Sequence, residues 1–274
     1  MQALIDLFQE YQLIGAAAGL VLLLVLEQAH PFFDFFRGSL KKKGKHLFRN
    51  LLLGFLNSLL ISLVFVSLWV AVSTWADENN FGILNWLALE TPWRVILAIL
   101  LFDFWMYAWH WLNHVVPFFW RFHRVHHSDP NMDVTTASRF HIGEIFFSSL
   151  FRIGIIAVTG IYVWELLLYE TMMFAVVQFH HANIVLPPKV DKFIRIFIIT
   201  PAMHKVHHSR WQPETDSNYG AFLTIWDRLG RTFRLREKLE DIRIGLDEFD
   251  SPEHESVKGL FRMPLRRDKK KGED

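Results

Sequence analysis

Residues 51–75 carry no charged side chain over 25 consecutive positions, and this run constrains the fold more than any other feature of the sequence. A helix of about 20 apolar residues crosses the hydrocarbon core of a bilayer, so the run predicts a membrane-spanning helix. Its one amide side chain, Asn57, is tolerated where it packs against another helix. Hydrophobic residues make up 51% of the 274 positions, which agrees with a membrane protein and disfavours a soluble enzyme.

Further apolar segments on both sides of this run predict additional membrane-spanning helices. They cover residues 13–26, 93–111, 145–163 and 166–177. The last two segments form one or two helices, because the apolar pattern is interrupted near residues 162–165. We therefore expect an all-α fold, an integral membrane helical bundle of four or five spans.

Basic residues between the first two predicted spans indicate how the bundle is oriented. They are Arg37, Lys41, Lys42, Lys43, Lys45 and Arg49. Acidic residues, Asp77 and Glu78, follow the second span instead. Because short cytoplasmic loops are enriched in Lys and Arg, the basic loop is predicted to be cytoplasmic. Counting the spans forward places the histidine-rich segments on the same face, so we expect a multi-pass protein with a cytoplasmic, histidine-rich helical cap.

The composition divides the chain into three predicted parts. Residues 1–92 hold the first spans and the basic loop, residues 93–235 form the histidine-rich domain, and residues 236–274 form a polar cytoplasmic tail. Twenty-nine basic and 28 acidic residues leave a net charge of +1, so we expect no nucleic-acid partner. The absence of Cys excludes disulfides, thiolate metal ligands and a Cys nucleophile.

Fourteen histidines stand out in this apolar chain, and many of them follow a repeated spacing. The pattern His-x-x-His-His occurs at His123, His126 and His127 and again at His204, His207 and His208. Positions i, i+3 and i+4 share one face of a helix, so each copy is predicted to aim its imidazoles into one common space, as are His110 and His114. Neutral imidazole binds iron, zinc, copper and nickel, and the number of histidines suffices for two such ions.

Other polar residues near these motifs carry less specific signals. His141 and His180 lie between the two copies, and both a ligand role and a structural role are open for them. Asp103 lies seven residues before His110 on nearly the same helical face, and we predict that it accepts the free N–H of a metal-bound imidazole. Glu144, three residues after His141, is a weaker candidate for a similar role.

Several runs of sequence in the histidine-rich domain strongly resemble the fatty acid hydroxylase/sterol desaturase superfamily. They are DFWMYAWHWLNH (103–114), WRFHRVHHS (120–128), TTASRFH (135–141), QFHHAN (178–183), TPAMHKVHHS (200–209), NYG (218–220) and WDRL (226–229). The resemblance covers roughly residues 95–235 and identifies residues 93–235 as a di-metal catalytic domain similar to that superfamily.

The resemblance implies a membrane enzyme with two iron ions at a cytoplasmic histidine centre, which hydroxylates or desaturates a lipid using O2 and external electrons. By resemblance, ligand roles fall to His110, His114, His123, His126, His127, His181, His204, His207 and His208. Asn218 becomes a candidate catalytic residue in the same way. Because no cytochrome b5-like sequence flanks the domain here, we expect a separate electron-donor protein.

The spacing His-x3-His at His110 and His114 is similar to the branch that contains sterol desaturases and alkylglycerol monooxygenase, so a sterol, fatty acyl or alkylglycerol type of lipid is implied. Trp111 stands where many relatives have Arg, and Ile142 where they have Pro, which puts the substrate class in doubt more than the chemistry. The alternative hypothesis is a histidine-rich zinc hydrolase or metal transporter. The sequence disfavours it, because no His-Glu-x-x-His occurs and the histidines lie at span ends rather than at the bilayer midplane.

Overall fold

Helices form the regular secondary structure of the part of the chain that the computed structural model describes, residues 2–266. The α-helices are α1 (Gln2–Ala29), α2 (Leu40–Leu60), α3 (Val66–Glu78), α4 (Ile83–Trp86), α5 (Thr91–Val115), α6 (Pro117–His127), α7 (Ile142–Thr159), α8 (Val163–His181), α9 (Pro188–Ile194), α10 (Pro201–His207), α11 (Gln212–Thr215), α12 (Ile225–Leu229) and α13 (Val257–Arg262). The π-helix is η1 (Ile61–Phe65), and the 3-10 helices are η2 (Val134–Ser138), η3 (Leu239–Asp241), η4 (Asp247–Phe249) and η5 (Met263–Leu265). Isolated β-bridges are the only strand-like pairs within residues 2–266, so the all-α prediction is confirmed.

Three helical segments among the described residues are long and apolar enough to cross a membrane. They are Leu40–Trp86, Thr91–Val115 and Ile142–Thr159. The first contains the uncharged run 51–75, which continues from α2 through η1 into α3. The shorter helix Ala17–Ala29 is also apolar. These segments agree with a membrane protein, and three of the predicted spans coincide with them.

Proline and glycine set the ends of the helices that carry the functional segments. Pro117 begins α6 directly after α5, because the missing N–H of a proline costs nothing in the first helical turn. Gly160 ends α7 with φ 67°, a left-handed conformation that glycine adopts without strain. The carboxylate of Glu165 then accepts the backbone N–H of Tyr162 at 2.9 Å and caps α8. The interruption in the apolar pattern is therefore a turn between two separate helices.

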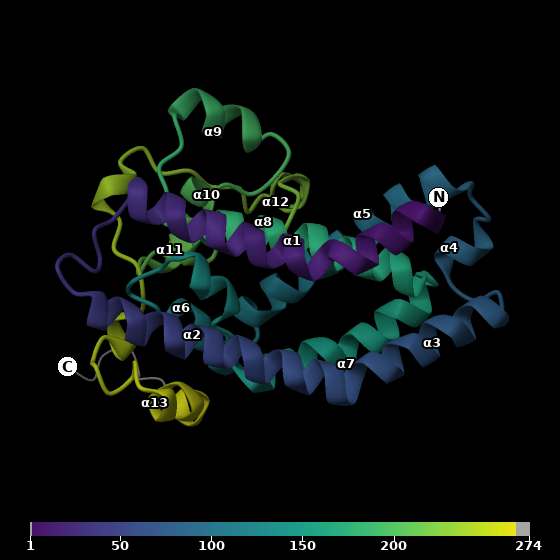
Figure 1. Ribbon diagram of the computed structural model, residues 1–274, viewed down its shortest axis with the longest axis horizontal. Helices are drawn as coiled ribbons and strands as arrows, with labels where there is room; N and C mark the ends of the chain where they lie inside the picture. The colour runs from purple at the N-terminus through teal and green to yellow at the C-terminus, as the bar shows by residue number, and fades with distance from the viewer. Residues whose placement is uncertain (1, 267–274) are drawn as a thin grey trace.

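The long helices run side by side along the molecule, and several of the short helices gather toward one end of it. Figure 1 shows α2, α3 and α7 along the lower edge, with α1 and α8 above them. The short helices α10, α11 and α13 lie at the left end, whereas α4 lies at the right end. A core that includes Phe65, Phe102, Ile156 and Tyr169 joins η1, α5, α7 and α8.

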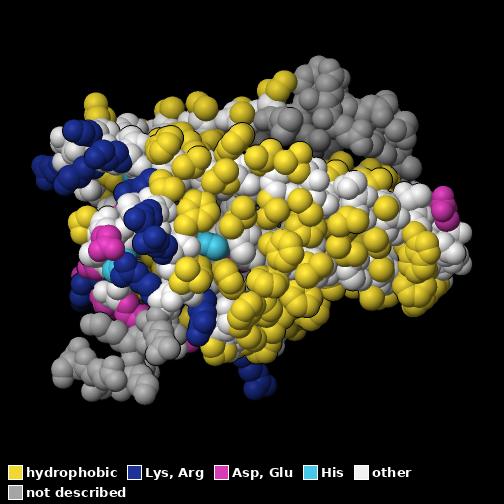
Figure 2. Space-filling view, turned by 90° about the horizontal axis from the view of Figure 1, so that it is seen from below, with side chains coloured by type: hydrophobic (Ala, Val, Ile, Leu, Met, Phe, Trp, Pro, Cys, Tyr) yellow, Lys and Arg dark blue, Asp and Glu magenta, His cyan; other side chains and the backbone are white. Residues whose placement is uncertain are grey.

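Polar and apolar side chains are separated along the same axis. Hydrophobic side chains cover the middle and right of the face in Figure 2. Lys and Arg side chains gather at its left end, where the short helices lie. This separation is typical of a bundle whose apolar part lies in lipid and whose basic end contacts water and headgroups.

Candidate metal centre

Nine histidines form two adjacent clusters at the end of the bundle that holds the short helices. Cluster one consists of His110, His114, His123, His127 and His207. Cluster two consists of His126, His181, His204 and His208. In each cluster, one ring nitrogen per histidine lies within 4.8 Å of the others. The fold thus brings together the nine residues to which the sequence assigned ligand roles, and each cluster could hold a metal ion.

Each His-x-x-His-His copy divides its side chains between the two clusters. His123 and His127 belong to cluster one, whereas His126 between them belongs to cluster two. The prediction that each copy serves one common space is therefore wrong. Successive residues are about 100° apart on a helix, so His126 and His127 point to different sides of α6. In the second copy, His204 and His208 belong to cluster two, and His207 between them belongs to cluster one. The rings of His127 and His208 stack with centroids 4.5 Å apart where the two clusters meet.

Nε2 atoms of several histidines approach one another closely within each cluster. In cluster one, Nε2 of His123 lies 3.1 Å from Nε2 of His110 and 3.2 Å from Nε2 of His127. In cluster two, Nε2 of His181 lies 2.9 Å from Nε2 of His204. Imidazole nitrogens bind zinc at about 2.0–2.1 Å, so two ligands of one such ion lie about 3 Å apart. The donor atoms and their spacing fit one transition-metal ion per cluster.

Glu144, on α7, contacts a cluster-one histidine from outside the cluster. Its Oε1 lies 2.9 Å from Nδ1 of His123, and both side chains are buried. A carboxylate in this place holds the proton on Nδ1 and leaves the lone pair of Nε2 directed into the cluster. The sequence suggested Glu144 through its nearness to His141, whereas the contact is with a histidine 21 positions away.

Within the described part of the chain, Asp103 does not contact the imidazoles as the sequence predicted. Its Oδ1 accepts a hydrogen bond from Tyr169 Oη at 3.0 Å. Its Oδ2 accepts from the backbone N–H of Leu223 at 3.1 Å and from Trp226 Nε1 at 2.8 Å. The prediction is corrected because a spacing of seven residues preserves the helical face but places Asp103 about 10 Å further along α5 than His110. Asp103 instead anchors the segment after α11 to the bundle.

Two backbone carbonyls orient further histidines of cluster one. Nδ1 of His207 lies 2.6 Å from the carbonyl oxygen of Ser217, and Nδ1 of His110 lies 2.8 Å from that of Tyr219. Asn218 lies between these two carbonyls with φ 54°. Its buried amide donates to the carbonyls of Met203 and Arg234 and accepts from the Arg234 N–H. Asn218 therefore shapes the turn that supplies both acceptors.

Burial keeps the imidazoles of the short helices neutral in the absence of metal. Burial first, and neighbouring histidines second, hold the pKa well below its usual value for His126, His127, His204 and His208. Burial and His123 lower the pKa of His207 to about 3. Only the neutral imidazole binds a metal, so these side chains are in the form that a ligand requires.

The two histidines whose roles the sequence left open occupy different places. The ring of His180 is buried, and its centroid lies 3.9 Å from the ring centroid of His204, beside cluster two. His141 precedes α7, where its Nδ1 accepts the backbone N–H of Gly143 at 2.9 Å and caps the helix. Among the described residues, neither histidine contributes a nitrogen to the clusters.

A mostly apolar cavity of about 380 Å³ extends from both clusters between α2, α5, α7 and α8. His110 of cluster one and His126 of cluster two line it. The exposed side chains of Leu51, Phe55 and Phe174 also line it, so the cavity reaches the apolar surface of the bundle. An apolar molecule can therefore reach the histidines from the apolar side of the bundle.

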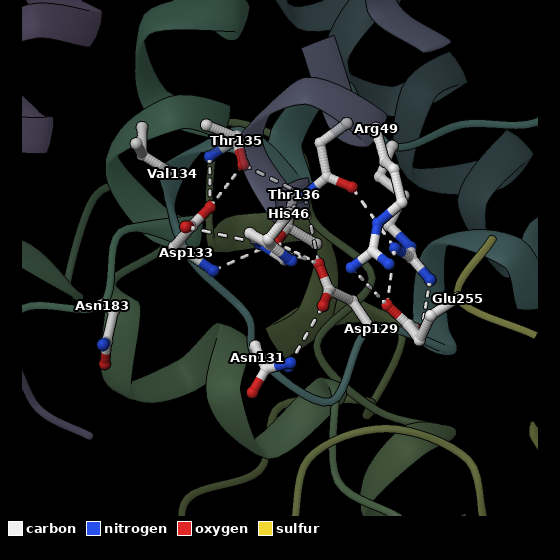
Figure 3. A network of polar contacts seen from close by, with 12 residues as sticks. His46, Arg49, Asp129, Asn131, Asp133, Val134, Thr135, Thr136, Asn183 and Glu255 are labelled. Carbon is white, nitrogen blue, oxygen red and sulfur yellow. Dashed lines mark hydrogen bonds and ion pairs between the residues drawn. The ribbon is translucent and has the colours of Figure 1, made fainter. Parts of the chain in front are cut away.

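A buried polar network separate from the clusters surrounds His46 (Figure 3). The ring of His46 is 3.4 Å from Asp133 and 3.7 Å from Asp129, and Arg139 donates to Glu255 at 2.9 Å. His46, Asp129 and Glu255 are close enough to one another to surround a cation. The guanidinium of Arg139 already neutralises charge there, so we interpret the network as a structural link between α2, the loop after α6 and the C-terminal segment.

Comparison with known proteins adds independent information about the histidine-rich segment. A family model described as fatty acid hydroxylase matches residues 95–232. Alkylglycerol monooxygenase of Homo sapiens is 30% identical over 162 residues, which cover 57% of this chain and 34% of that protein. Ornithine lipid hydroxylase OlsE of Rhizobium tropici is 31% identical over 157 residues, or 56% of this chain and 45% of that protein.

A third relative is cholesterol 25-hydroxylase of Rattus norvegicus, 25% identical over 143 residues, which cover 52% of this chain and 47% of that protein. The matched part of the chain thus spans between about a third and a half of the length of these relatives. No solved structure matches the chain significantly.

Proposed function

This chain belongs to the fatty acid hydroxylase family, and we propose that it is a membrane-bound di-iron monooxygenase that hydroxylates or desaturates a lipid. Its relatives are named for activities on an alkylglycerol, an ornithine lipid and cholesterol. We therefore propose a lipid substrate of sterol, fatty acyl or alkylglycerol type. Both reactions consume O2, two electrons and two protons; hydroxylation releases one water molecule and desaturation releases two.

The observation that carries this proposal is that two histidine clusters face one apolar cavity. One iron ion would be held by the five histidines of cluster one and a second by the four of cluster two. When bound, the irons would supply the activation of O2 and the oxidation of an unactivated C–H bond.

The chain's own side chains would position the metals and the lipid. Glu144 and the carbonyls of Ser217 and Tyr219 fix the tautomer and orientation of three imidazoles. The apolar cavity walls would exclude water and hold the lipid chain with one carbon near the clusters. No side chain of the protein has to act as a nucleophile in this reaction.

We propose a multi-pass membrane arrangement in which α1, the α2–α3 segment, α5, α7 and α8 supply four or five spans. The basic residues at positions 37–49, which the structure places just before α2 and in its first turns, support a cytoplasmic location for the end that carries the histidines. Residues 93–235 would form the catalytic domain, preceded by the membrane segment 1–92 and followed by the tail 236–274. Electrons would come from a separate donor protein that approaches the cytoplasmic end.

Metal analysis and O2 uptake of the detergent-purified protein test this function. After reconstitution with Fe2+, the wild type should hold about two irons per chain and consume O2 when a chemical reductant and lipids are added. The double variant His207→Ala/His208→Ala removes one ligand from each cluster and should lose both properties. The control His30→Ala changes an exposed histidine outside the clusters and should retain them. Stoichiometric zinc without O2 uptake, even after iron reconstitution, would favour the hydrolase or transporter alternative.

A further inference from the structure

An ion pair between a buried arginine and a partly exposed glutamate forms part of the cavity lining at some distance from the histidine clusters. Nη1 of Arg152 on α7 lies 2.8 Å from Oε1 of Glu170 on α8, and both side chains line the cavity. Arg152 is only 7% exposed, and its guanidinium lies 4.9 Å from the ring centroid of Trp69. Since α7 is apolar enough to cross a membrane, a charged side chain in its middle, paired with one on α8, is costly and indicates a function.

The pair lies at a defined depth relative to cluster one. Glu144, which contacts His123, precedes Arg152 by eight positions on α7. Eight helical residues span about 12 Å. Ser148 lies between these two positions and also lines the cavity. One wall of the cavity therefore runs along α7 from cluster one to Arg152.

The ion pair has hydrogen-bonding capacity that its neighbours leave unused. Among the described residues, Nε of Arg152 has no hydrogen-bond partner, and Oε1 of Glu170 has none beyond its ion pair with Arg152. Nη2 of Arg152 donates to Met106 Sδ at 3.5 Å, and a thioether is a weak acceptor. The cavity thus presents an unused donor beside an acceptor with free lone pairs.

Because Arg152 and Glu170 neutralise each other, the pair favours an uncharged ligand over an anionic one. Glu170 already neutralises the guanidinium of Arg152, so a carboxylate or phosphate could bind only by breaking the pair and leaving Glu170 without a partner. A hydroxyl group carries no charge and both donates and accepts hydrogen bonds. It can donate to Glu170 and accept from Arg152 at the same time.

We propose that Arg152 and Glu170 form a subsite for an uncharged hydroxyl group of the lipid, about 12 Å along α7 from Glu144, the residue that contacts cluster one. The proposal rests on the proposed function, because the clusters define which end of the lipid reacts. A hydroxyl held at this depth fixes which carbon of the chain is oxidised. A lipid without the hydroxyl displaces water from Arg152 and Glu170 but forms no hydrogen bond with them. Such a lipid therefore binds less well.

The informative variant is the double substitution Arg152→Met/Glu170→Leu. A single Arg152→Ala substitution would leave the partly buried carboxylate of Glu170 without its partner and is expected to lower stability. Apolar replacement of both members of such a pair is commonly tolerated. The matched control is Arg94→Met/Glu165→Leu. It removes another ion pair that also involves α8, with N···O 2.9 Å, but neither residue lines the cavity.

The probes are linear primary alcohols of increasing length, the alkanes of the same lengths, and the corresponding methyl ethers, which accept a hydrogen bond but cannot donate one. The wild type and the control variant should turn over alcohols with a kcat/KM about tenfold to hundredfold above that for alkanes. Their products should carry the new functional group at a constant distance from the hydroxyl, whatever the chain length. The Arg152→Met/Glu170→Leu variant should keep its metal and its alkane turnover. It should lose the preference for alcohols over alkanes and the constant distance between the hydroxyl and the new functional group.

Failure of the subsite and failure of the oxygenase function give different results. If the double variant retains the preference and the constant position, the subsite is overturned while the function stands. If the iron-loaded wild type oxidises no lipid, the function fails, and the subsite is then tested by the rise in Tm that a bound ligand causes. A rise that alcohols produce in the wild type and not in the double variant supports the subsite, and an equal rise in both overturns it.

Discussion

Glu144 Oε1 and His123 Nδ1 lie 2.9 Å apart, and this contact links the apolar helix α7 to cluster one. Loss of an acceptor behind a metal-binding imidazole typically lowers metal affinity or activity about tenfold to hundredfold. We predict an effect of this size for Glu144→Ala. Glu144→Gln keeps an acceptor oxygen and should show a smaller loss. Metal titration of the metal-free protein, followed by turnover measurements, checks both variants.

The control for this prediction is Glu248→Gln, which changes an exposed carboxylate far from α7 in sequence. It should bind metal like the wild type. Equal metal affinity in Glu144→Ala and in this control would show that the contact with His123 does not tune the imidazole.

The division of each histidine motif between two clusters predicts which pairs of substitutions act together. His127→Ala/His207→Ala takes two ligands from cluster one and should leave the ion of cluster two in place. His126→Ala/His127→Ala takes one ligand from each cluster and should weaken both ions. Metal content after dialysis distinguishes the two double variants. Similar residual metal in both would mean that the sequence motif, and not the spatial cluster, is the unit that binds an ion.

The features that the sequence predicted correctly are those with a local cause. The run 51–75 forms part of a long apolar helical segment, because hydrophobicity over 25 consecutive residues needs no tertiary information. The side chains of His110 and His114 share cluster one, because a spacing of four keeps them on one face of α5. Helical periodicity was sufficient for both conclusions.

The features that the sequence did not predict depend on how helices pack against one another. The side chain of His126 belongs to cluster two, and not to the cluster of His123 and His127, because His181 and His204 on other helices lie on that side of α6. The helical wheel gave the face of Asp103, but not that its carboxylate is bonded to Tyr169, Leu223 and Trp226 instead of an imidazole. The sequence could not identify the backbone carbonyls of Ser217 and Tyr219 as hydrogen-bond acceptors, since every residue has a carbonyl.

The turn at Asn218 predicts a graded effect of two substitutions. Asn218→Gly removes the side-chain hydrogen bonds but tolerates φ 54°, whereas Asn218→Ala also strains the backbone. We expect the alanine variant to be less stable than the glycine variant by about 1 kcal/mol. Both variants should lose metal from cluster one, because the carbonyls that hold His110 and His207 flank this turn. Thermal unfolding and metal analysis of the two variants provide the comparison, and unchanged metal content in both would contradict the assigned role.

The buried histidines predict how the stability of the metal-free protein depends on pH. Burial and His123 lower the pKa of His207 to about 3, whereas an unfolded histidine titrates near 6.5. Between these values the unfolded state binds more protons than the folded state, so the free energy of unfolding rises with pH. This contribution is complete above about pH 6.5 and is lost as the pH falls toward 3. Thermal unfolding of the metal-free protein at about pH 5 and about pH 7 should therefore give a lower Tm at pH 5. The His207→Gln variant should show a smaller difference, and an equal difference would assign the pH dependence to other groups.

Substitution of Asp103 should mainly lower stability, whereas substitution of Glu144 should mainly lower metal binding. Asp103 accepts hydrogen bonds from Tyr169, Leu223 and Trp226 and contacts no cluster histidine in the described part of the chain. Asp103→Ala would leave one buried donor, on Tyr169, and two partly buried donors without an acceptor, so we expect a loss of stability on the order of 2–4 kcal/mol. The fraction that remains folded should hold as much metal as the wild type, because the acceptors of His110, His123 and His207 are intact. Glu144→Ala should show the reverse, with metal loss larger than the loss of stability. If Asp103→Ala lost metal in proportion to Glu144→Ala at equal folded fraction, Asp103 would support an imidazole after all, and the hydrogen bonds that anchor the segment after α11 would be the means by which it does so.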